Sequence, residues 1–120
     1  MTPDMDGLLL VSKVVDGDSV NGSIHFDVSR FDGWTLTAWK EDRFRIITLD
    51  TPERGEVGWA EAKAHVTEWL ASHPNTRIRT YGRDSFGRTL ADIYDRDTGD
   101  TLTEFMLRER GWLPWVGSAR

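Results

Sequence analysis

The stretch FRIITLDTPERGEVGWAEAK, residues 44–63, opens as a buried strand and closes as a helix. Between them lie Asp50, Thr51, Pro52 and Glu53. Proline ends a strand because it cannot donate to the ladder, and an aspartate before Thr-Pro is ordinary turn chemistry. The alternative is a site in which these oxygens meet a cation. That hypothesis needs further oxygen ligands and positive charge elsewhere in the chain.

A second acidic group, Asp16 and Asp18, flanks a glycine in the segment VVDGDSV, residues 14–20. Taken alone, Asp-Gly-Asp predicts a turn. Arg45 lies in the alternating apolar strand that leads to Asp50. An arginine on an apolar strand face needs a partner, and a structural carboxylate such as Asp18 can serve. A structural ion pair and a functional group of charges both remain open.

A third segment, DSFGRTLADIY (84–94), places Arg88 directly after Gly87. The guanidinium fork suits bidentate recognition of phosphate. Gly87 is available for the positive φ angle that a hairpin loop needs. Arg88 is therefore either a solvated hairpin residue or a phosphate ligand.

Short strands must position these three segments. Alternation and turn signals predict a meander in the first half of the chain. Its parts are a strand over 8–15, the turn DGDS, a strand over 20–29, an Asp-Gly turn within 30–34, a strand over 35–39, a tight connection at KED (40–42) and a strand over 43–49.

The second half of the chain predicts a helix, a hairpin and a second helix. Apolar residues at helical spacing predict an amphipathic helix over 58–72, followed by strands over 76–82 and 88–95. A capping box from Thr101 to Glu104 starts a terminal helix, and Gly111 stops it. The whole, a single domain over 1–120, is expected to be α+β and mainly β, an OB-type five-stranded Greek-key barrel with one inserted helix and a C-terminal helix.

Together the three segments resemble the staphylococcal nuclease family. That family carries an aspartate-glycine-aspartate-threonine motif after its first strand, an arginine in a strand ending in aspartate-threonine-proline-glutamate, and a later glycine-arginine that opens a strand. The resemblance covers residues 8–113, with the motifs in the same order.

Carried over residue by residue, the resemblance implies a Ca²⁺ site. Asp18 and Asp50 would bind the ion through their carboxylates and Thr51 through its backbone carbonyl, with Asp16 as a nearby acid. An all-oxygen set without His or Cys suits a hard cation and disfavours zinc. Water and substrate phosphate would complete the shell.

The same carry-over implies three catalytic residues. Arg45 and Arg88 would hold the scissile phosphate, and Glu53 would position or deprotonate the attacking water. The substrate is then DNA or RNA, with single strands favoured, and Phe86 or Trp115 could stack a base.

The chain departs from the family pattern in three places. Ser85 and Phe86 stand where the family has a lysine and a tyrosine, so an ammonium and a hydroxyl are missing from the side that holds a terminal phosphate. The segment between 20 and 44 is longer and predicts an extended hairpin. The sequence ends soon after Trp115, where many members continue into a third helix.

Composition limits the partners. The formal net charge of −5 argues against a general nucleic-acid binder, although a bound cation and two arginines would offset the acids of the site.

Cysteine is absent, which excludes disulfides and thiolate chemistry. No leader or membrane span is recognisable, so we expect a cytoplasmic monomer without membrane contacts; export of a parent chain whose leader is trimmed stays open as the alternative.

Two other functions stay open at this stage. One is a non-catalytic nuclease-like OB module that binds nucleic acid or a protein. The other is a structural or inhibitory protein whose acidic surface mimics or repels nucleic acid.

Overall fold

The computed structural model describes residues 3–114. The elements are β1 (Met5–Asp16), β2 (Ser19–Phe31), β3 (Trp34–Ile46), β4 (Leu49–Asp50), α1 (Trp59–Ser72), β5 (Thr76–Arg83), β6 (Thr89–Asp95), α2 (Leu102–Glu104), a π-helical turn (Phe105–Glu109) and β7 (Leu113–Pro114). The expectation of a mainly β protein with added helices is confirmed. None of the described helices is long and apolar enough to cross a membrane.

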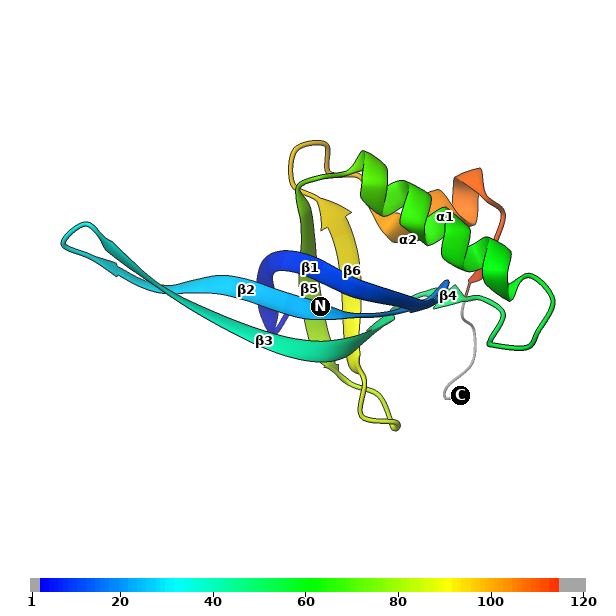
Figure 1. Ribbon diagram of the computed structural model, residues 1–120, viewed down its shortest axis with the longest axis horizontal. Helices are drawn as coiled ribbons and strands as arrows, with labels where there is room; N and C mark the ends of the chain where they lie inside the picture. Colours follow the sequence, from blue (N-terminus) through cyan, green and yellow to red (C-terminus); the bar gives the residue numbers. More distant parts are fainter. Residues whose placement is uncertain (1–2, 115–120) are drawn as a thin grey trace.

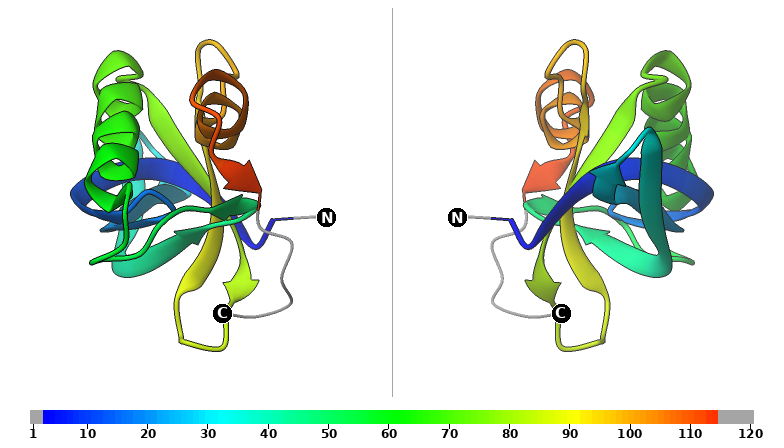
Figure 2. Two further views of the ribbon diagram at one scale, coloured as in Figure 1. Left: turned by 90° about the vertical axis from the view of Figure 1, so that its right-hand side faces the viewer. Right: turned by 90° about the vertical axis from the view of Figure 1, so that its left-hand side faces the viewer.

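Five strands close into a ring in the order β1-β2-β3-β6-β5 (Figures 1 and 2). Neighbours pair antiparallel except β3 and β6, which run parallel, with Arg45 opposite Leu90. The helix α1 leaves the ring after β4 and returns the chain to β5 (Figure 1). The predicted helix over 58–72 and the predicted hairpin of strands 76–82 and 88–95 are confirmed to within one residue.

The core fills the ring and the space beneath α1. Alternate residues of β2, β3, β5 and β6 point inward, and α1 adds Ala62, Val66 and Trp69. Leu102 and Met106 from the C-terminal helical segment complete the same cluster. Burial of these side chains, at roughly 1.5–3 kcal/mol for each large one, is the main force that holds the two helical segments on the ring.

The connection predicted at KED (40–42) is wrong. Lys40, Glu41 and Asp42 continue β3 and pair with Ile24, Ser23 and Gly22 of β2. Three charged residues do not by themselves turn a chain, because a tight turn needs glycine, asparagine or proline at defined positions. The predicted strands over 35–39 and 43–49 are therefore one strand that ends at Ile46, and Thr48 takes a positive φ of 72° before β4.

β2 and β3 form a long hairpin that projects away from the ring (Figure 1). Pairing of β2 with β1 ends at His25, and pairing of β3 with β6 begins at Phe44. We call residues 26–39 the hairpin arm; within the described sheet, these residues pair only with one another, apart from Trp39, which pairs with His25. The extended hairpin predicted for this part of the chain is confirmed.

The C-terminal helix differs in form from the expectation. Thr101 caps it as predicted, because the Thr101 hydroxyl accepts the Glu104 N–H at 3.1 Å. After one short α-helical piece the chain continues as a π-helical turn that closes with the Arg110 N–H on the Phe105 carbonyl at 3.1 Å. Gly111, at a φ of 72°, then ends the helix as predicted.

Candidate functional site

A buried contact brings together three segments that are far apart in the sequence. Asp18 lies in the turn from β1 to β2, Arg45 near the end of β3 and Thr51 after β4. The Thr51 N–H donates to Asp18 Oδ2 at 3.0 Å, and Arg45 Nη1 lies 3.3 Å from the same oxygen. The Asp18 and Arg45 side chains are only 1% and 5% exposed. We call these three residues the buried cluster.

Arg45 is held in the buried cluster by its own strand as well. Its Nη1 donates to the Ile46 carbonyl at 2.9 Å. The Ile46 N–H in turn donates to the Asp18 carbonyl at 2.8 Å, which fixes the turn against the end of β3. The ion pair expected for an arginine on an apolar strand is therefore present, and the partner of Arg45 is Asp18.

Gly17 lets the turn approach α1. A Cβ atom at this position would lie 2.7 Å from both Ala62 Cβ and Thr51 Oγ1. Such distances are too short for any side chain, so the glycine is required by close approach. The Thr51 hydroxyl is buried here without a hydrogen-bond partner in the described part of the protein.

Asp16 is tied to the helix. The Trp59 indole N–H donates to Asp16 Oδ1 at 2.7 Å, so the end of β1 is fixed to the first residue of α1. Lys63 Nζ lies 4.1 Å from the centre of the Trp59 ring. Sequence reasoning missed this role of Trp59. A partly buried indole N–H needs an acceptor, but nothing in the sequence pattern identifies Asp16 as that acceptor.

Asp50 is half-buried and belongs to the two-stranded sheet of β4 and β7, where it pairs with Leu113. A pocket beside it is lined by Asp50, Thr51, Pro52, Glu56, Gly111, Trp112 and Leu113. Two of the predicted metal ligands, Asp50 and Thr51, thus share a pocket with the segment that follows the π-helical turn.

Glu53 lies in the exposed loop that follows Thr51. The Glu53 N–H donates to the Glu56 carboxylate, and the Glu56 N–H donates to the Glu53 carbonyl at 2.9 Å. These bonds form a turn that presents Glu53 at the surface next to the buried cluster. Glu56, which sequence reasoning passed over, holds this turn.

Arg88 directly precedes β6, in which Leu90 pairs with Arg45. The Arg88 Nε donates to Asp84 Oδ2 at 2.8 Å. Asp84 also accepts the N–H groups of Phe86 and Arg88, each at 2.9 Å.

Burial alone would raise the pKa of Asp84, but these hydrogen bonds and the Arg88 charge hold that pKa below its ordinary value. Arg88 is thus held within residues 84–88, which we call the hairpin loop. Asp84 was missed as its partner, although an aspartate four residues before an arginine across a loop glycine was visible in the sequence.

Ser85 and Phe86 form the exposed tip of the hairpin loop, and the Phe86 ring lies 5.6 Å from the Arg88 guanidinium carbon. Gly87 has the predicted positive φ, of 80°. Trp115, the other predicted base-stacking residue, lies outside the described residues. The tip thus offers one exposed ring beside one arginine.

Of the groups predicted for Ca²⁺, the Asp18 carboxylate accepts the Thr51 N–H, and Asp50 directly precedes Thr51 in the chain. Two carboxylates and one carbonyl are hard ligands, but they supply fewer than the 6 to 8 oxygens that Ca²⁺ takes. Across residues 3–114, no group of three or more His, Cys, Asp or Glu side chains is arranged to hold a metal ion. The donor chemistry fits Ca²⁺ only with water or substrate oxygens added.

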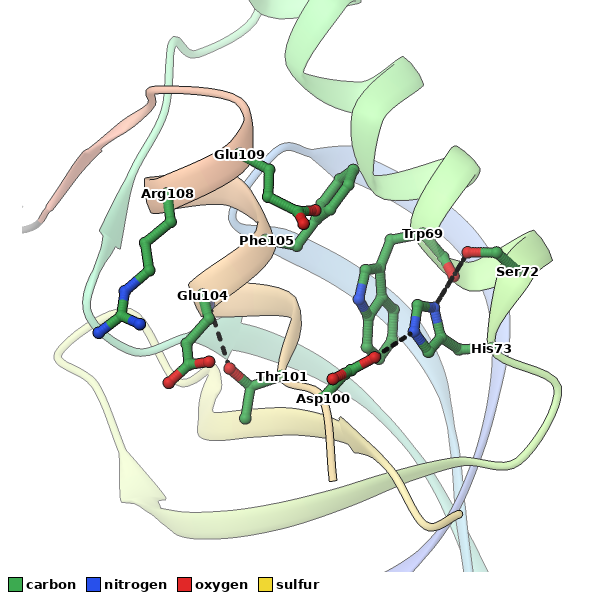
Figure 3. A pocket seen from close by; sticks show the side chains of 9 residues that line it. All are labelled: Trp69, Ser72, His73, Asp100, Thr101, Glu104, Phe105, Arg108 and Glu109. Carbon is green, nitrogen blue, oxygen red and sulfur yellow. Dashed lines mark hydrogen bonds and ion pairs between the residues drawn. The ribbon is translucent and has the colours of Figure 1, made fainter. Parts of the chain in front are cut away.

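A second pocket lies between the end of α1 and the C-terminal helical segment (Figure 3). His73 stacks on Trp69 at 4.1 Å, its Nδ1 lies 2.8 Å from the Trp69 carbonyl, and its Nε2 lies 3.2 Å from Asp100. Both ring nitrogens thus face oxygens, and His73 joins α1 to the loop before α2. None of the predicted site residues lines this pocket.

No protein-family model matches this chain, and a search of curated proteins finds no match to it.

Proposed function

We propose that this protein is a Ca²⁺-dependent nuclease that hydrolyses phosphodiester bonds in single-stranded or frayed DNA and RNA with little sequence preference. One observation carries the proposal. Asp18, Arg45 and Thr51, from three separate segments, meet in one contact, with Asp50 and Glu53 on either side of Thr51 along the chain. The five-stranded ring with α1 inserted before β5 supports an OB-type Greek-key barrel as its scaffold.

Each residue has a distinct part in the reaction. A water oxygen bonds to phosphorus while the bond from phosphorus to the leaving sugar oxygen breaks. Glu53, at the exposed edge, orients this water and accepts its proton. Arg45 and Arg88 offset the charge that grows on the phosphoryl oxygens. Phe86, exposed at the loop tip, contacts a base.

Asp18, Asp50 and the Thr51 carbonyl would hold the Ca²⁺ ion. When bound, the ion supplies positive charge beside the phosphate. The bond from the Thr51 N–H to Asp18 holds the backbone at Thr51 beside one of these carboxylates. Strand pairing of Asp50 with Leu113 holds the backbone that carries the other.

A second candidate is a non-catalytic module of the same scaffold, and two specific observations favour it. Asp18 is already engaged by Arg45 in a buried pair, and Arg88 is engaged by Asp84. Arg88 would have to exchange Asp84 for a phosphate, and Arg45 would have to reach the phosphate from within a buried pair. A module that only binds nucleic acid or a protein needs no such exchange.

Cleavage of heat-denatured DNA at low salt separates the two candidates. The nuclease requires activity with Ca²⁺, no activity with excess chelator, and loss of activity in Glu53→Gln and Arg88→Met. Glu61→Gln is the matched control, because Glu61 is an exposed acid on α1 whose carboxylate lies near His65. If cleavage is absent but Ca²⁺ with a nucleotide bisphosphate raises the melting temperature, the binding module is supported.

A further inference from the structure

The hairpin arm carries an apolar face that no described part of the protein covers. Antiparallel partners share a face of a sheet, so the pairs Phe31 with Trp34 and Ser29 with Leu36 point the same way. This is also the direction of Ala38 and, at the base of the hairpin, of the core residue Ile24. We call Phe31, Trp34 and Leu36 the arm face.

The arm face is exposed and large. Phe31, Trp34 and Leu36 are 62%, 72% and 56% exposed. With about 150 to 250 Å² for a large aromatic side chain, the arm face and its flanking backbone offer on the order of 500 Å². An apolar patch of this size is often used for binding. A two-stranded hairpin also gains little stability unless something packs on it.

The opposite face of the hairpin arm is polar. It carries Thr35, Thr37 and the Arg30 to Asp27 ion pair, whose nitrogen and oxygen are 2.6 Å apart. Trp39 lies on this polar face at the base of the arm and stacks on His25 at 6.1 Å. One face of the hairpin arm is thus apolar and the other is polar. The same difference is found between the buried and the solvent-exposed face of a sheet that packs on a partner.

Charge excludes two classes of occupant. Residues 26–39 carry Arg30 against Asp27 and Asp32, and Arg30 is already paired within the arm. A phosphate backbone or an anionic membrane requires a positive surface, which the arm does not offer. A surface that is apolar and nearly neutral fits best against another of the same kind.

We propose that the arm face packs against the arm face of a second copy of this chain, in a two-fold symmetric dimer. Two such faces would bury about 1,000 Å² in total, the lower limit for a specific interface, and the dissociation constant is then expected in the micromolar range. The same patch on both copies is self-complementary, as two-fold symmetry requires. The proposal departs from the expectation of a monomer and does not depend on nuclease activity.

Sedimentation equilibrium from below to above micromolar concentration tests the dimer. The intact chain is expected to shift from monomer to dimer. Trp34→Ser and, separately, Phe31→Ser are each expected to raise the dissociation constant at least about tenfold, because exposed aromatic anchors dominate such interfaces. Trp39→Ser is the matched control: the same residue type, similarly exposed, but on the opposite face, so it is expected to dimerise like the intact chain.

The melting temperature of each variant as a dilute monomer shows that the ring is intact, because the arm face lies outside the core. A chain that stays monomeric throughout overturns the proposal, as does a dimer that survives both arm-face variants. If the monomer instead binds single-stranded DNA or anionic vesicles in a way that Trp34→Ser abolishes, the arm face belongs to that ligand and the dimer proposal fails.

Discussion

The buried cluster and the hairpin loop each hold one of the two arginines that the proposed chemistry needs, but they hold them differently. Arg45 contacts Asp18, 27 residues away in the sequence, and both side chains are almost fully buried. Arg88 contacts Asp84, four residues away, and both side chains are partly exposed to water. One pair is built by the fold and the other by a local turn.

The difference decides what each pair can contribute. A buried pair cannot lose one partner without leaving the other charge in a poorly solvated interior, which costs several kcal/mol. A partly exposed pair is screened by water and can exchange partners cheaply. We therefore expect the buried cluster to dominate stability and the hairpin loop to provide the arginine that can move to a substrate.

The largest effect is expected from Asp18→Ala. The change leaves Arg45 and the Thr51 N–H without this carboxylate and should lower the free energy of unfolding by about 3–5 kcal/mol. Asp27→Ala is the control, because it removes an exposed ion pair and should cost about 1 kcal/mol or less. Urea unfolding measures both. If the two variants cost the same, the buried cluster has no special role in stability.

Gly17→Ala is expected to come next. The added methyl group meets Ala62 Cβ and Thr51 Oγ1, so overpacking should cost about 1–3 kcal/mol. A double-mutant cycle with Ala62→Gly sharpens this prediction, because removing the Ala62 methyl should recover part of the loss. If the changes in unfolding free energy for the two substitutions are strictly additive, the turn at Gly17 and α1 are not in tight contact.

Asp84→Asn tests the hairpin loop. The amide oxygen can still accept the N–H groups of Phe86 and Arg88, but the charge that holds the Arg88 side chain is gone. Stability should fall by about 1 kcal/mol or less. If Arg88 binds substrate phosphate, its release should lower the KM for single-stranded DNA in Ca²⁺. An unchanged KM with full activity would place Arg88 outside the substrate site.

Acid should weaken the base of the hairpin loop. Burial would raise the pKa of Asp42, but the Thr89 hydroxyl, the Arg43 N–H, Arg83 and Lys40 together lower it. A lowered pKa stabilises the fold above the unfolded value near pH 4, and this contribution is lost as pH falls through the lower folded pKa. Unfolding free energies measured from pH 6 down to acid should fall more steeply for the intact chain than for Asp42→Asn. Parallel curves would contradict this.

The smallest effect on stability is expected from Phe86→Ser. The ring is exposed at the loop tip, so the free energy of unfolding should change by less than about 0.5 kcal/mol. If Phe86 stacks a base, binding of single-stranded DNA should weaken severalfold. Fluorescence titration with a labelled oligonucleotide measures this, and Val57→Ser, another exposed apolar residue, is the control. Equal binding by both variants would remove Phe86 from the site.

Local features of the fold were predictable from the sequence. Gly87 in the hairpin loop, Thr101 as helix cap and the amphipathic helix α1 all depend on residues within a few positions of one another. The Asp18 to Arg45 pair could also be proposed, because an arginine between core residues leaves few choices of partner.

Contacts set by the curvature of the ring were not predictable. The bond from Trp59 to Asp16 and the closeness of Gly17 to Ala62 depend on how α1 lies across the strands, and hydrophobic periodicity carries no such information. The prediction at Lys40–Asp42 was wrong for another reason: three consecutive charged residues interrupt the apolar alternation, but the backbone pairing with β2 continues through them.

The pairing of β4 with β7 has a consequence for the order in which the protein is made. Asp50 leaves the ribosome early, but its strand partner Leu113 is synthesised much later. Proteins fold while they are being synthesised, so the strands of the long hairpin can pair while Asp50 still waits for its partner. A ribosome stalled between these two positions would therefore carry a nascent chain in which Asp50 has no β7 strand to pair with.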